Sequence, residues 1–167
     1  LHLSLRRQRQ MCIRDSTISQ RAGQCKNGIE IKEGDGHLSN ALRHDGMKMI
    51  EVDIKKDQGH NISKDSVCQS LENRIEGDSM EYARIAPPCS SYSTARYPRI
   101  RSKRHPQGLP QLSGKVWKQL ALANKVTNNA FKLAEFCAKR RMLVTIENPR
   151  RQLALAPKGL SAACQGI

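Results

Sequence analysis

The hydrophobic and polar positions of the chain follow two periodicities, which together predict strands and helices in alternation. Compact apolar runs predict strands around Ile29 and Ile31 and in residues 47–54 and 142–149, and residues 77–86 predict a turn followed by another strand. Each run is followed by glycine, proline or an acidic residue, which marks where the strand stops. We therefore expect strands separated by longer connections.

Helical spacing fills most of those connections. A short helix is expected ahead of Gly46, a typical C-terminal cap, and residues 63–75 repeat their apolar positions at intervals of four. An apolar stripe in steps of three and four predicts one long helix over residues 113–141, after a basic, proline-containing loop at 94–111. The order β-α-β-α-β-loop-α-β predicts an α/β fold, a parallel sheet with crossover helices whose ligands bind at the carboxyl ends of the strands.

The charge balance favours a polyanionic partner. The 167 residues include 29 lysines and arginines against 15 acidic residues, a formal net charge of +14. Because each neutralised phosphate releases condensed counterions, such an excess is typical of proteins that bind nucleic acid, structural RNA binders included. Charge alone therefore indicates a class of partner and no particular activity.

The six cysteines are scattered without a Cys-x-x-Cys pair, which argues against a zinc site and against the disulfide framework of small secreted domains. We expect no metal, and a reducing, intracellular compartment, either cytoplasm or nucleus. No apolar run approaches the ~20 residues that a membrane span needs, so we expect no membrane partner.

The two ends of the chain fall outside the predicted domain. Met11–Ser16, MCIRDS, resembles an in-frame translation of an adapter used in sequencing libraries, so residues 1–16 are interpreted as adapter-derived or as a disordered basic tail. Residues 17–26 are then a linker, residues 27–157 the α/β domain, and residues 158–167 an unstructured tail.

Two glycines follow the first predicted strand, where a ligand can approach the backbone closely. Glu33, Gly34 and Gly36 precede the first helix, and Asp53 closes the next strand, where a carboxylate can accept hydrogen bonds from ribose hydroxyls. A simple turn is the alternative, and Ser39 stands where the dinucleotide-binding motif has its third glycine. A nucleoside ligand without a pyrophosphate would not need that glycine.

A cysteine with two prolines before it ends the third predicted strand. Pro87 and Pro88 fix the backbone and remove two donors, so the strand must end there and present Cys89, with the hydroxyls of Ser90 and Ser93 nearby. A lone cysteine at a strand end is otherwise a small core residue. Beside the basic residues that follow, a thiol at the ligand edge of a sheet is a candidate nucleophile.

Glu147 and Asn148 follow the last predicted strand in the same way. A charged side chain at the end of a buried strand is rarely placed there only to be solvated. The alternative is a strand cap, in which both side chains satisfy loop amides and Pro149 stops the strand. A carboxyl at the mouth of a pocket is also able to donate a proton to a ring nitrogen.

A dense basic run follows the candidate nucleophile. A solvated loop is the ordinary explanation of such a run, but its position predicts phosphate binding beside the chemistry. The predicted phosphate contacts are Arg96, Arg99, Arg101, Lys103 and Arg104.

These segments together resemble the catalytic domain of the DNA (cytosine-5) methyltransferases, in particular divergent members from mobile elements and environmental sequences. The stretch Pro88-Cys89-Ser90-Ser91-Tyr92-Ser93 is similar to that family's Pro-Cys-Gln-x-Phe-Ser, with Ser for Gln and Tyr for Phe. Glu147-Asn148 matches the first two residues of its Glu-Asn-Val segment, and the motifs occur in the family's order over roughly residues 27–157.

The resemblance implies a Rossmann-like S-adenosylmethionine-dependent methyltransferase fold and a monomer that acts on duplex DNA with a flipped cytosine. Cys89 would be the nucleophile, Glu147 would hydrogen-bond or protonate N3 of the base, and Asn148 would fix the loop. The resemblance places S-adenosylmethionine across a set of residues near the first three strand ends, namely Glu33, Gly34, Gly36, Asp53 and Pro87. It places DNA on Ser90, Ser93 and the basic run.

The chain departs from that family in places that affect the prediction. Lys32 or Glu33 stands where family members have a cofactor-packing Phe, and no Gln-x-Arg-x-Arg segment follows Glu147, so the resemblance implies a C-terminally incomplete catalytic domain. An inactive remnant that only binds nucleic acid is therefore the alternative. An amino-methyltransferase is disfavoured, because Ala86 and Cys89 stand where its Asp/Asn-Pro-Pro-aromatic segment has the acid or amide and the aromatic residue.

Overall fold

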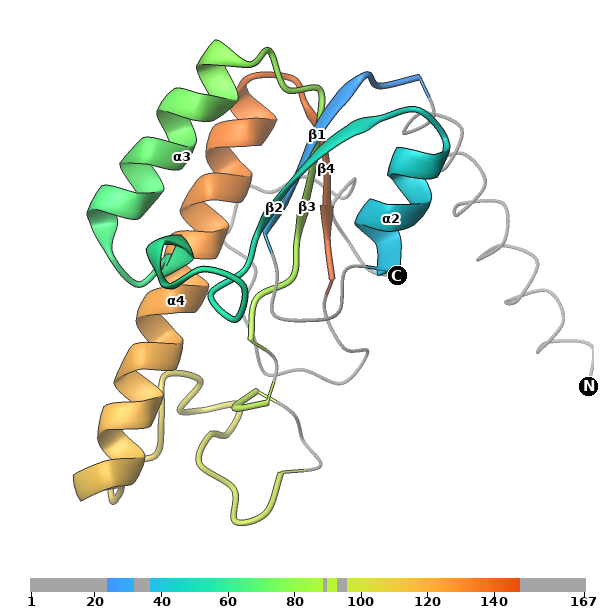
Figure 1. Ribbon diagram of the computed structural model, residues 1–167. Helices are drawn as coiled ribbons and strands as arrows, with labels where there is room; N and C mark the ends of the chain where they lie inside the picture. Colours follow the sequence, from blue (N-terminus) through green and yellow to red (C-terminus); the bar gives the residue numbers. More distant parts are fainter. Residues whose placement is uncertain (1–23, 32–36, 89, 93–95, 148–167) are drawn as a thin grey trace, which may run out of the picture.

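The chain folds as an α/β unit around one parallel sheet (Figure 1). The computed structural model describes residues 24–31, 37–88, 90–92 and 96–147. Within these ranges four strands pair in the order β2-β1-β3-β4, and every pair is parallel. They are β1 (Asn27–Ile31), β2 (Lys48–Val52), β3 (Tyr82–Ile85) and β4 (Leu143–Ile146). The predicted α/β class, with a parallel sheet and crossover helices, is confirmed.

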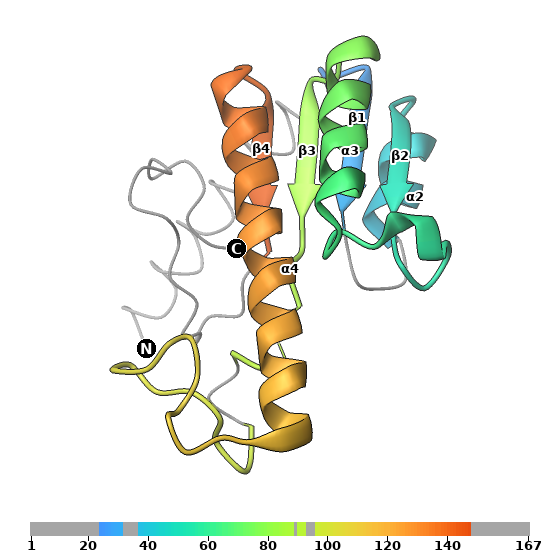
Figure 2. The ribbon, with the colours of Figure 1, turned by 90° about the vertical axis from the view of Figure 1, so that its left-hand side faces the viewer.

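The helices form two layers around this sheet. They are α2 (His37–His44), the short η1 (Gln58–His60), α3 (Asp65–Gly77) and α4 (Gly114–Lys139). Figures 1 and 2 show α2 on one face of the sheet, and α3 with α4 on the other. This layering follows from right-handed crossovers, because the chain steps from β1 to β2 in one direction and then to β3 and β4 in the other.

The strand order fixes where a ligand is expected. The chain reverses its direction of travel across the sheet between β1 and β3, which are hydrogen-bonded neighbours. In open α/β sheets the crevice outside the carboxyl ends of two such strands is the usual ligand site. The relevant ends are Ile31 and Ile85, which lie side by side in the register.

The main core lies between the sheet and the α3–α4 layer. Alternate strand residues point to this face, and they pack on the apolar stripes of the two helices. Cys137 of α4 is fully buried here, and this burial raises the pKa of its thiol to about 12. The principal contributors are Ile29, Ile31, Ala83, Ile85, Val144, Ile146, Leu71, Ile75, Leu133 and Ala134.

A smaller core lies under α2. Leu42 packs there with Met47, Met49 and Tyr82. Gly28 of β1 leaves room for them, because a Cβ at this position would lie 2.6 Å from the sulfur of Met49. The smaller core therefore requires a residue without a side chain at position 28.

Helix α4 is longer than the sheet that it covers. Its 26 residues begin well beyond the carboxyl edge of the strands, and the loop of residues 96–113 lies beside its N-terminal half (Figure 2). Asn124 fixes that loop by donating to the carbonyl of Gln107 at 2.8 Å. Within the described ranges, neither α4 nor any other helix is long and apolar enough to cross a membrane.

The predicted cap at Gly46 is confirmed and gives a first test of the fold. Gly46 has φ +90° and its amide donates to the carbonyl of Arg43 at 3.0 Å. A Cβ at Gly46 would meet nothing within 4 Å, so Gly46→Ala adds only the conformational cost of positive φ. We expect urea denaturation to show a loss of about 1 kcal/mol in the free energy of unfolding.

The matched control is Gly77→Ala at the end of α3. A Cβ there is equally free of contacts, but Gly77 does not have positive φ. This substitution should leave stability unchanged or raise it by up to about 1 kcal/mol, because alanine favours helix. Equal losses for the two variants would show that Gly46 is not required for its backbone conformation.

Candidate functional site

A largely apolar cavity of about 300 Å³ lies at the carboxyl edge of the sheet. Ile31, Val52 and Ile85, the final residues of three neighbouring strands, form its base, and the cavity therefore occupies the switch point of the fold. Helix α4 supplies the facing wall through Gln119, Leu122, Ala123, Val126 and Ala130. Its position and its apolar walls are typical of a small-ligand site.

The residues around the candidate nucleophile form another part of the wall. Pro87, Pro88 and Ser90 all line the cavity. Cys89 itself lies outside the described residues, as do Glu33, Gly34, Gly36, Ser93 and Asn148, so their predicted roles stay predictions. The structure nevertheless places both sequence neighbours of Cys89 on the cavity.

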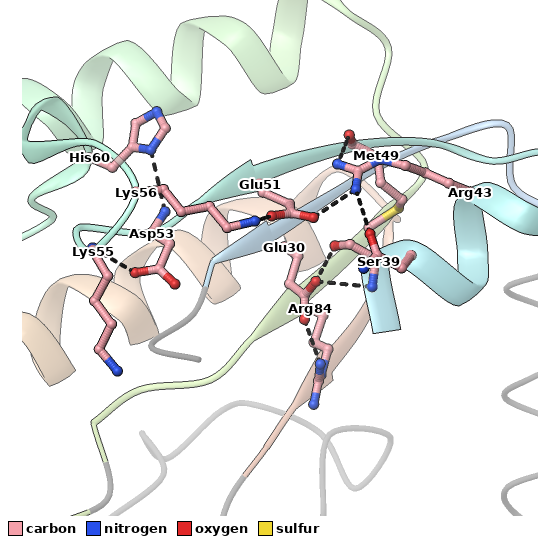
Figure 3. A network of polar contacts seen from close by, with 11 residues as sticks. Glu30, Ser39, Arg43, Met49, Glu51, Asp53, Lys55, Lys56, His60 and Arg84 are labelled. Atoms are coloured by element: carbon pink, nitrogen blue, oxygen red, sulfur yellow. Dashed lines mark hydrogen bonds and ion pairs between the residues drawn. The ribbon is translucent and has the colours of Figure 1, made fainter. Parts of the chain in front are cut away.

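Asp53 lies directly at the end of β2, between two residues that line the cavity. Its side chain is buried, with 1% of the residue exposed, and Oδ1 accepts a hydrogen bond from the amide of Lys55 at 2.8 Å. Its own amide donates to Nδ1 of His60 at 3.3 Å. These contacts, drawn in Figure 3, fix the carboxylate and the following turn at the edge of the site.

The segment after β2 contributes residues that the sequence-based prediction missed. His60, Asn61 and Ile62 line the cavity beside η1. His60 accepts through Nδ1, so its neutral ring carries the proton on Nε2. The Oδ1 atom of Asn61 accepts from the amide of Ser63 at 3.0 Å, which fixes the orientation of that side chain. The only sequence signal for these residues was their place after a strand that ends at the ligand edge.

Glu147 lies at the same edge of the sheet, but it contacts the α2 side of it. It is 54% exposed at the side chain and is not among the described residues that line the cavity. One of its oxygens pairs with Nη2 of Arg84, a β3 residue on the face opposite the main core. The structure therefore brings Pro87 and Ser90 together on one cavity, and neither Asp53 nor Glu147 is among the described residues that line it.

Arg84 joins Glu147 to a fully buried carboxylate. Its Nη1 contacts Oε1 of Glu30 at 2.5 Å, and Glu30 is 0% exposed (Figure 3). The other oxygen of Glu30 accepts from the amide of Ser39 at 3.2 Å and from the Ser39 hydroxyl. Since these four residues belong to β1, α2 and β3 and to the position after β4, the network joins these elements on the α2 face of the sheet.

The basic run divides into two kinds of residue. Arg101 is 2% exposed, its guanidinium donates to the carbonyls of Ser91 and Pro106, and it stacks 3.7 Å from the centroid of the Tyr92 ring. Burial lowers the pKa of this guanidinium. Arg101 therefore holds the loop together, and we do not retain it as a phosphate contact.

The other cations of the run are more accessible. Arg99, Lys103 and Arg104 are exposed, whereas Arg96 is half-buried and its Nε is a buried donor without a hydrogen-bond partner. No cluster of three or more His, Cys, Asp or Glu side chains in the described ranges is arranged to hold a metal ion. The described part of the site thus combines an apolar cavity with cations in the adjoining loop.

No protein-family model matches the chain, and no curated protein matches it.

The buried pair of Glu30 and Arg84 generates a prediction about stability. Arg84→Met removes a cation that contacts the buried Glu30 carboxylate, so we expect the free energy of unfolding to fall by about 3–5 kcal/mol. Arg84→Lys keeps the charge but cannot contact Glu30 and Glu147 through two separate nitrogens. The free energy of unfolding should therefore fall by less than in Arg84→Met. Urea denaturation monitored by circular dichroism measures both variants.

Arg74→Met is the control for this prediction. It removes the same groups from a pair with Asp78 whose side chains are 54% and 50% exposed. Its effect should stay below about 1 kcal/mol. If Arg84→Met and Arg74→Met cost the same, the Glu30–Arg84 pair does not support the fold as described.

Proposed function

We propose that the chain binds S-adenosylmethionine at the carboxyl edge of its sheet and uses Cys89 to direct methyl transfer to C5 of cytosine in DNA. One observation carries the proposal: Pro87, Pro88 and Ser90 line a cavity at the switch point of a parallel sheet. A nucleophile between Pro88 and Ser90 would stand beside whatever occupies that cavity. On this proposal the α/β unit is a Rossmann-like methyltransferase fold.

The cavity suits the nucleoside part of such a cofactor. Its walls are largely aliphatic, which favours a planar base, and His60 and Asn61 add polar groups able to orient that base. Asp53, at the end of β2, would accept hydrogen bonds from the ribose hydroxyls. The glycine turn at residues 34–36 would pass close to the methionine part, as the resemblance implies.

The chemistry assigned to the protein is that of a covalent nucleophile. The Cys89 thiolate would form a bond to C6 of the cytosine, which makes C5 electron-rich. Bound S-adenosylmethionine would supply the methyl group that C5 takes up and would leave as S-adenosylhomocysteine. Loss of the C5 proton to a base and cleavage of the S–C6 bond would then release 5-methylcytosine and restore the thiolate.

Glu147 would act on the base from the neighbouring strand end. In the proposed reaction its carboxyl group hydrogen-bonds N3 of the flipped cytosine, so that the ring accepts the thiolate at C6. Arg84 contacts this carboxylate from β3 and is itself held by Glu30. The network thus supports a fixed position for Glu147 before DNA arrives.

Filling the cavity tests the cofactor site. Ala123 lines the cavity, so Ala123→Phe should abolish binding of S-adenosylmethionine in isothermal titration calorimetry, because the added ring occupies the space of the ligand. Ala121 lies two positions earlier on an exposed part of α4, so Ala121→Phe is a matched control that should bind as the unmodified chain does. Equal binding by all three proteins would place the cofactor elsewhere.

Covalent trapping tests the nucleophile. Duplex DNA with 5-fluorocytosine should form an adduct with Cys89 in the presence of S-adenosylmethionine, because fluorine at C5 cannot leave as a proton does and the S–C6 bond persists. Mass spectrometry of the tryptic peptide locates the adduct. A chain that binds DNA but forms no adduct would support the non-enzymatic alternative.

Two cysteine variants complete this experiment. Cys89→Ala should form no adduct. Cys68→Ala should form it normally, since Cys68 is half-buried, burial raises the pKa of its thiol, and its Sγ contacts the carbonyl of Ile62. Loss of the adduct in Cys68→Ala with retention in Cys89→Ala would overturn the assignment.

A further inference from the structure

A long part of the chain is free of acidic residues. No Asp or Glu occurs between Glu81 and Glu135, although lysines and arginines recur throughout that stretch. It includes the loop of residues 96–113 and the N-terminal half of α4, and Figures 1 and 2 show both of these beyond the carboxyl edge of the sheet. The positive charge of this stretch is therefore concentrated at one end of the molecule.

Two of these cations lie at the start of α4, close to residues that line the cavity. Lys115 lies one helical turn before Gln119, and Lys118 lies one turn before Leu122; both Gln119 and Leu122 line the cavity. The helix face that forms the cavity wall therefore continues outward as a basic face. Lys115 and Lys118 are both exposed.

An exposed aromatic side chain accompanies the cations of the loop. Tyr97 is 94% exposed, between Arg96 and Arg99 in the sequence. Exposed rings among cations are typical of surfaces on which nucleic-acid bases stack while phosphates contact the charges. We call the exposed set the basic lobe, and its members are Tyr97, Arg99, Lys103, Arg104, Lys115 and Lys118.

We propose that the basic lobe binds the sugar–phosphate backbone of a nucleic acid beside the cavity, with Lys115 and Lys118 on phosphates. The choice of nucleic acid as partner rests on the proposed function. The binding itself needs neither the cofactor nor Cys89. An anionic membrane surface is the competing partner, but the charges here adjoin a cavity suited to a nucleoside.

The test compares two double variants with the same change of charge. Lys115→Gln/Lys118→Gln removes two cations from the basic lobe. Lys26→Gln/Lys48→Gln removes two exposed lysines at the starts of β1 and β2, the opposite edge of the sheet. Fluorescence anisotropy measures binding of a labelled oligodeoxynucleotide, as a duplex and as a single strand, at several salt concentrations without cofactor.

The lobe variant should lower the slope of log affinity against log salt concentration by about 1.8 for the duplex and about 1.4 for the single strand, because two phosphate contacts are lost. The control variant should keep the slope of the unmodified chain. Equal slopes for the two variants would show that the positive charge acts diffusely and would overturn the proposal. Binding to anionic lipid vesicles with none to either oligonucleotide would overturn it as well.

Comparison with trapping separates the two proposals. An adduct at Cys89 with normal binding by the lobe variant would refute the lobe alone, whereas lobe-dependent binding without an adduct would refute only the methyl transfer.

Discussion

The ion pair of Glu30 and Arg84 is the interaction on which the arrangement of the sheet edge depends. A fully buried carboxylate is costly unless it is paired and hydrogen-bonded, and Glu30 obtains its partners from β3 and from the start of α2. Arg84 continues the contact to Glu147 after β4. One buried charge thus determines how the start of α2, the middle of the sheet and the end of β4 lie relative to one another.

The other face of the sheet supplies a complementary, apolar environment. β1 and β3 are neighbours, but the chain crosses the sheet in opposite directions after each of them. Their carboxyl ends therefore leave a cavity, which α4 covers. The projecting half of α4 then extends that wall as a basic surface. The proposed reaction uses both faces, with an apolar ligand site on the α4 side, a positioned carboxylate on the α2 side and Cys89 between them in the chain.

Local patterns were sufficient to predict the strands and helices, and contacts between distant residues were not. The glycine at residue 46, the apolar stripe of α4 and the strand ends all followed from short-range periodicity and turn chemistry. The burial of Arg101 did not, because its partners are loop carbonyls and the Tyr92 ring. Likewise, no local pattern marks Glu30 as a buried charge, since its pairing with Arg84 spans 54 residues of sequence. The sequence pattern around a polar residue does not show whether its side chain makes tertiary contacts or is exposed to solvent.

Methyl NMR of the isoleucines tests the central claim, that the cavity binds S-adenosylmethionine, most directly. Four isoleucines line the cavity, namely Ile31, Ile54, Ile62 and Ile85, while Ile75 of α3 packs in the main core and Ile100 lies in the loop. Titration with the cofactor should shift the methyl signals of the four lining residues and leave those of Ile75 and Ile100 in place. Absence of any shift, or shifts confined to Ile75 and Ile100, would contradict the account.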